Sequence, residues 1–110
     1  MKKIILVTMG VLLMVACAVN RYRSDFEFAN KLAKEGLWQE AIFRWQKTMT
    51  PGVGSAALHN NLAVAMEGLG RYDDARREYE LALKLAPADK QIQSNFNRFK
   101  GNQRKGANEK

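Results

Sequence analysis

Few side chains in this sequence are of the types that carry out chemistry. Cys17 is the only cysteine and His59 the only histidine among 110 residues, and Asp73 with Asp74 is the best candidate for a metal site. A metal centre or a nucleophile with its base needs several such groups near one another. The two aspartates are better explained as a first helical turn, where carboxylates favour the positive end of the helix dipole, and His59 as a packed structural residue. We therefore expect no enzyme activity, no metal and no cofactor.

Cys17 instead ends a segment that is typical of a secretory signal peptide. Lys2 and Lys3 precede the apolar run 4–16, and Ala16, a small residue, stands directly before the cysteine. As a helix this run would rise only about 20 Å, whereas the hydrocarbon core of a bilayer is about 30 Å thick. A cleaved signal peptide over residues 1–16 is therefore favoured over an uncleaved transmembrane anchor.

The stretch 13–17, Leu-Met-Val-Ala-Cys, resembles the lipobox of bacterial lipoproteins, although Met14 stands where the family usually has leucine. The resemblance implies that Cys17 receives a diacylglyceryl group, becomes the new N-terminus and takes a further acyl chain such as palmitate. Two or more chains anchor a protein stably, whereas one alone binds marginally. The following residue is Ala18 and not the family's inner-membrane retention aspartate, so the outer membrane facing the periplasm is favoured. A free, buried cysteine is the alternative.

The rest of the chain is organised by an internal repeat of about 34 residues, with copies at about 22–55 and 56–89. Repeats of this length indicate stacked helix pairs. Pro87 ends the second copy, in which Ala82 stands where the first copy has Thr48, and the proline of the first copy comes early, at Pro51. The copies align without gaps at Phe28 with Leu62, Ala29 with Ala63, Gly36 with Gly70, Trp38 with Tyr72, Ala41 with Ala75, and Trp45 with Tyr79.

These positions resemble the tetratricopeptide repeat, which implies an all-α solenoid of about two units and a C-terminal capping helix at 89–100. Alanines would lie where the two helices of a pair cross, aromatic residues would fill the space between units, and glycines would close the first helices. The predicted repeat domain is 24–100, and Ser24 with Glu27 fits a capping box at its start. A lipidated linker at 17–23 precedes it, and a disordered basic tail at 101–110 follows. The expected helices span 24–35, 38–49, 55–68, 72–85 and 89–100.

The same resemblance implies a concave groove, lined by the first helix of each repeat, that takes a segment of a partner protein. Asn30 and Asn61 match asparagines of the carboxylate-clamp type, but Phe26, Gln91 and Asn95 replace the basic residues of that clamp. A mixed apolar and polar segment is therefore expected in place of a C-terminal carboxylate. The predicted partner-binding residues are Phe26, Asn30, Lys34, Asn60, Asn61, Val64, Glu67 and Arg98.

The net charge of the chain says little about its function. The net charge of +7 falls to +5 without Lys2 and Lys3, and residues 98–110 hold +4 of it. The basic character thus belongs to the tail and does not indicate a nucleic-acid-binding face. Arg21 and Arg23, close to Cys17, are placed to meet anionic lipid head groups.

The sequence predicts a membrane-anchored adaptor or assembly factor of the bacterial cell envelope. Two alternatives stay open: a structural subunit of an envelope complex with no exchangeable peptide ligand, and a binder of envelope polyanions through the basic tail. Because repeat arrays usually need three or more units for stability, we also expect self-association or a larger complex.

Overall fold

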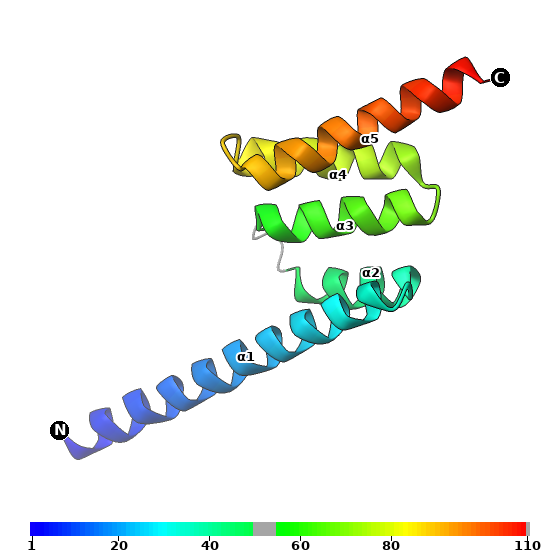
Figure 1. Ribbon diagram of the computed structural model, residues 1–110. Helices are drawn as coiled ribbons and strands as arrows, with labels where there is room; N and C mark the ends of the chain where they lie inside the picture. The colour runs from blue at the N-terminus through cyan, green and yellow to red at the C-terminus, as the bar shows by residue number, and fades with distance from the viewer. Residues whose placement is uncertain (50–54, 110) are drawn as a thin grey trace.

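The computed structural model describes residues 1–49 and 55–109, and in this part of the chain consecutive helices run antiparallel. Figure 1 shows a stack of helix pairs, with the N-terminal half of α1 and the C-terminal turns of α5 projecting beyond it. The fold is the helical solenoid that the repeat predicts, preceded by a long apolar helix. Pro51 lies outside the described residues. The helices are α1 (Lys2–Lys34), α2 (Trp38–Thr48), α3 (Ala56–Gly68), α4 (Tyr72–Leu85) and α5 (Lys90–Asn108).

Two glycines make the turns inside the helix pairs. Gly36 and Gly70 have φ of 78° and 74°, the left-handed region that a Cβ disfavours. After α3, the Gly70 amide donates to the Glu67 carbonyl at 3.0 Å and the Arg71 amide to the Met66 carbonyl at 2.8 Å. Gly36 and the residue after it make the same two bonds at the end of α1. This Schellman motif satisfies the last carbonyls of the helix, so both repeats turn the chain in the same way.

Side-chain caps set the start of the helices that follow the longer connections. The Ser55 hydroxyl accepts a hydrogen bond from the Leu58 amide at 3.1 Å, and the Asp89 carboxylate accepts from the amides of Gln91 and Ile92 at 2.9 and 3.1 Å. Each cap satisfies amides that have no partner inside the helix. The starts of α3 and α5 thus agree with the expected positions.

The core follows the repeat. Ala29, Ala41, Ala63 and Ala75 are fully buried, as small residues must be where two helices of a pair approach closely. Leu62 and Ala82 are buried beside them. The large residues between units are buried as well, since Trp45 is 2% exposed and Tyr79 is fully buried. The Tyr79 ring lies 5.4 Å from the Phe96 ring and 5.5 Å from the Phe99 ring, so aromatic contacts attach α5 to the second repeat.

Two of the aromatic residues expected to pack in the stack do not belong to the core, and Pro87 is exposed as well. Phe28 is 44% exposed, although its counterpart Leu62 is buried. Leu62 packs in the interior of the stack, whereas Phe28 lies on α1, at the outer end of the stack that the described residues form. Arg44 covers one face of its ring instead, 4.9 Å from the centroid. Tyr72 is 47% exposed, although its ring lies 6.4 Å from the ring of Phe99 in α5.

The first helix differs from the prediction at its start. α1 is unbroken from Lys2 to Lys34, so Ser24 does not cap a new helix and Glu27 pairs with Arg23 at 3.1 Å. Elongating an existing helix is more favourable than nucleating a second one, and residues 17–24 contain neither glycine nor proline. The expected linker 17–23 is helical and rises only about 10 Å.

The last helix also differs. The prediction of a disordered tail from Gly101 was wrong, because α5 continues to Asn108. Gln103, Arg104 and Lys105 are good helix formers, and they extend a helix that Phe96 and Phe99 already hold against the stack. Two glycines at about 1 kcal/mol each do not stop this extension.

Among the described residues, α1 is the one helix that is long and apolar enough to cross a membrane. The apolar window of α1 is fully exposed, and it lies near the N-terminus. These properties fit both a signal peptide and a membrane anchor.

Candidate functional site

The first helix of each pair, together with α5, lines a groove of about 410 Å³ on one face of the stack. This surface holds six of the eight predicted partner-binding residues. Five of its eleven lining residues carry carboxamides, and the others are two basic residues, two tryptophans of α2, one alanine and one valine. The lining residues are Asn30, Ala33, Lys34, Trp38, Trp45, Asn60, Asn61, Val64, Gln91, Asn95 and Arg98.

Asn30 joins three helices beneath the groove. Its Oδ1 atom accepts hydrogen bonds from Trp45 Nε1 of α2 at 3.1 Å and from Asn61 Nδ2 of α3 at 3.3 Å. The buried indole N–H would lose its partner without this oxygen. The two asparagines that match the family's peptide-binding positions are thus fixed in place by each other and by the core.

Asn60 connects the groove wall to the last helix. Its Oδ1 atom accepts a hydrogen bond from Asn95 Nδ2 at 3.1 Å, and the residue is only 5% exposed. Asn60 therefore serves mainly to align α3 with α5, a role that sequence reasoning missed because the two residues are 35 positions apart. The prediction that Asn60 presents its side chain to a ligand needs this correction.

Glu67 does not line this groove, but it lies beside Arg98 at the end of the groove and accepts two hydrogen bonds. Tyr79 donates its hydroxyl at 3.0 Å and Arg98 donates from its guanidinium at 3.3 Å, both to Oε2. Burial raises the pKa of the Tyr79 hydroxyl well above its ordinary value of 10.0, and the Glu67 carboxylate raises it further. Glu67 thereby positions Arg98, so that the negative charge at this end is already paired.

The groove continues beyond Arg98 into a wider hollow of about 920 Å³. The two spaces share Trp38, Val64 and Arg98, and Tyr72 and Glu67 line the second one. The far wall belongs to the C-terminal turns of α5 and includes Asn102, Gln103, Gly106 and Ala107. Sequence reasoning did not find this wall, because it treated those residues as a tail.

Phe26 was wrongly expected in the groove. It is partly buried and packs against the hydrophobic core. The Phe26 ring therefore contributes to stability on the inner side of α1, and Val64 with Trp38 is the main apolar surface that the groove offers.

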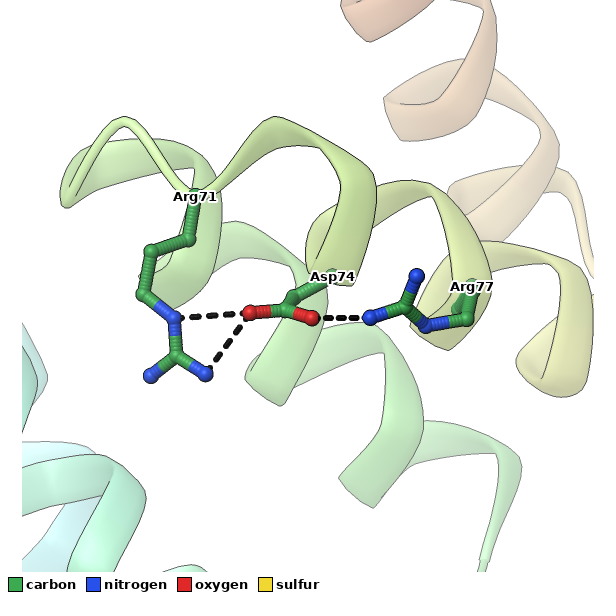
Figure 2. A network of polar contacts seen from close by, with 3 residues as sticks. All are labelled: Arg71, Asp74 and Arg77. Atoms are coloured by element: carbon green, nitrogen blue, oxygen red, sulfur yellow. Dashed lines mark hydrogen bonds and ion pairs between the residues drawn. The ribbon is translucent and has the colours of Figure 1, made fainter.

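Two of the remaining candidates for chemistry, His59 and Asp74, are engaged in structural contacts. His59 is buried, and its Nδ1 atom lies 2.6 Å from Glu78 Oε2, which joins α3 to α4. Figure 2 shows the Asp74 carboxylate between Arg71 and Arg77 in the first turns of α4. The hydrogen bond from Arg71 holds the pKa of Asp74 below its ordinary 3.8. Within residues 1–49 and 55–109, no cluster of three potential metal ligands occurs.

Cys17 lies far from the groove, on the projecting half of α1, and its side chain is exposed. A hollow of about 610 Å³ beside it is lined by α1 and by Lys47 and Thr48 at the end of α2. The anchor candidate and the end of the first helix pair are therefore neighbours.

Comparison with known families agrees with the repeat. Residues 56–89, which include α3 and α4, match the model of the tetratricopeptide repeat. No curated protein matches the chain. The match coincides with the second predicted copy, and the α1–α2 pair repeats its glycine turn and its crossing alanines. The protein is thus a helical-repeat solenoid, and its α3–α4 pair is similar to the tetratricopeptide repeat, a type of unit that generally binds other proteins and is not catalytic.

Proposed function

We propose that the protein is a membrane-anchored adaptor or assembly factor of the bacterial cell envelope, and that it binds a partner segment in the groove between α1, α3 and α5. The observation that carries this proposal is the groove itself. Six residues selected for partner binding from the repeat pattern line one continuous surface, fixed by Asn30 and Asn60.

The chemistry of the groove indicates what kind of segment fits. Carboxamides can donate to and accept from the backbone of an extended peptide, and Val64 with Trp38 offers an apolar contact. Lys34 is exposed at one side, and Arg98 stands at the other beside its partner Glu67. This arrangement suits an extended segment that alternates apolar and polar residues, in agreement with the mixed segment expected from the sequence.

The anchor is the second part of the proposal. Residues 4–16 are apolar and exposed on α1, and Cys17 follows them with an exposed side chain. Acylation at Cys17 after removal of residues 1–16 explains both features, and the lipobox resemblance supports the outer membrane facing the periplasm. Intact-mass analysis of the mature protein tests it: we expect an acylated N-terminal Cys17, whereas a chain that begins at Met1 would contradict lipidation.

The groove is tested by a pair of matched substitutions. Val64→Glu puts a charge on its apolar surface, and Phe43→Glu makes the same change on the exposed outer face of α2. We expect Val64→Glu to abolish co-purification of the partner from membranes and Phe43→Glu to preserve it. Lys34→Glu, at an exposed groove position, provides a second variant that does not disturb packing. Circular dichroism of each variant reports whether the helices are intact.

A second candidate function is a structural subunit that uses its outer face. The exposed apolar residues Phe43, Leu81 and Leu85, between 43% and 56% exposed, favour this alternative. In that case Phe43→Glu would release the partner and Val64→Glu would retain it. The same pair of variants thus separates the two functions.

A further inference from the structure

The topology places one edge of the helix stack next to the anchor. Consecutive helices alternate in direction. One edge of the stack therefore lies toward the N-terminal half of α1, and it is formed by the end of α2, the start of α3, the end of α4 and the start of α5. Figure 1 shows the end of α2, the start of α3 and the α4–α5 connection on the side to which α1 projects. Arg21 and Lys47 line the same hollow beside Cys17, so this edge begins at the level of Arg21.

The continuous helix fixes the distance from this edge to the lipid. Four residues separate Cys17 from Arg21, which is a rise of about 6 Å in a helix. An acyl chain on Cys17 would therefore hold the edge within the head-group layer. A helix also transmits the orientation of the anchor to the stack, which an extended linker would not do.

The two edges of the stack differ in charge. The edge near the anchor carries exposed Arg21, Lys47, Lys84 and Lys90. Its acidic groups are fewer or engaged: Glu27 pairs with Arg23, Asp89 caps α5, and Asp25 lies in the hollow beside Cys17. The opposite edge, where the α1–α2 and α3–α4 turns lie, carries the acidic residues Glu35, Glu40, Asp73 and Asp74 besides Lys34, and Asp74 there is paired with Arg71 and Arg77.

Side chains suited to a membrane interface accompany these charges. Tyr22 is 44% exposed one turn after Ala18, and Leu85 is 55% exposed at the end of α4. Tyrosine is enriched at the level of lipid head groups. Basic side chains next to apolar ones are the composition that binds anionic lipid surfaces.

We propose that the edge formed by Arg21, Lys47, Lys84 and Lys90 docks on the anionic head groups of the membrane that holds the anchor. This proposal rests on the membrane anchoring proposed above. Docking would set the helices of the stack roughly perpendicular to the membrane plane, so that the partner groove opens to the side and the opposite edge of the stack faces away from the lipid.

The test uses the complete mature protein in vesicles of phosphatidylcholine alone or mixed with phosphatidylglycerol. A lysine-reactive reagent that does not cross membranes is applied, and peptide mass spectrometry measures labelling at each lysine. We expect labelling of Lys47, Lys84 and Lys90 to fall at least about three-fold when phosphatidylglycerol is present, because each basic residue gains about five-fold in membrane affinity near an anionic surface. Lys34 and Lys105, away from this edge, should keep their labelling, and added salt should reverse the protection.

Lys84 reports on the docking in a matched pair of double variants. Lys47→Gln with Lys90→Gln should return Lys84 labelling to the phosphatidylcholine level, whereas Lys34→Gln with Lys105→Gln should leave it protected. Equal labelling of the two edges in both vesicle types would overturn the proposal. Flotation with phosphatidylcholine vesicles tests the anchor separately, because the neutral lipid offers no charge attraction. A chain that floats but shows no charge-dependent protection refutes the docking alone, and a chain that floats with neither vesicle type refutes both.

Discussion

The hydrogen bond between Asn30 and Trp45 gives the sharpest prediction about how the groove is held. Asn30→Ala removes the oxygen that accepts from the indole N–H, while Trp45 stays 2% exposed. An unpaired buried donor costs about 1–3 kcal/mol, whereas alanine in a helix interior returns about 0.5 kcal/mol relative to asparagine. We therefore expect Asn30→Ala to lower the free energy of unfolding by about 1.5 kcal/mol.

The assay is chemical denaturation of the full chain in detergent, followed by circular dichroism. Asn97→Ala, at an exposed position of α5, is the matched control and should be neutral or slightly stabilising. Trp45→Phe removes the donor, so Asn30→Ala should cost less in that background. We expect a coupling of about 1 kcal/mol between the two positions. Fully additive effects would show that the indole N–H does not depend on Asn30 and would refute the reasoning.

Three further predictions concern turns, titration and packing. Gly70→Ala should destabilise the protein by about 1–2 kcal/mol, because φ is positive there, whereas Gly101→Ala inside α5 should stabilise it by up to about 1 kcal/mol; denaturation midpoints of the pair check both signs. Because the pKa of Tyr79 is raised in the folded state, the unfolded state releases this proton first, so the contribution of Tyr79 to stability is full below about pH 10 and is lost as pH rises above it. Tyr79→Phe should flatten that fall, and an unchanged loss of stability at alkaline pH would contradict the raised pKa of Tyr79. Trp45→Ala should lower the free energy of unfolding by about 3–5 kcal/mol and destabilise both repeats together, which loss of the helical circular dichroism signal would report. A loss of helix confined to α1 and α2 would argue against one stacked unit.

The fold was largely predictable from the second repeat. Gly70 and Tyr79 occupy positions whose physical demands are local: a left-handed turn and a large side chain between units. Gly36 and Trp45 meet the same demands 34 residues earlier. The equal spacing therefore indicated helix pairs, and the pairs occur where it placed them.

The predictions that failed concern residues whose environment depends on segments outside the repeat. Phe28 aligns with buried Leu62, but the repeat pattern alone does not tell that Phe28 lies on the outer face of the described stack. Ser24 is a good cap residue, yet a helix already formed before it continues through. The extension of α5 depends on Phe96 and Phe99 holding its first turns.

The groove was predicted in outline only. Placing Asn30, Asn61, Val64 and Arg98 on one surface follows from helical spacing within the repeat. The pairing of Asn60 with Asn95 does not, because it depends on how α3 and α5 pack against each other. Such amide contacts turn expected ligand-binding residues into structural ones, so a loss of binding in their variants must be read together with stability.

The central claim is that the groove between α1, α3 and α5 binds the partner. A photoreactive amino acid placed at Lys34, in the groove, and separately at Gln46, exposed on the outer face of α2, tests it most directly in intact cells. The account predicts a single crosslinked partner from Lys34 that disappears when Val64→Glu is added, and no such product from Gln46. Crosslinking from Gln46 but not from Lys34 would contradict it.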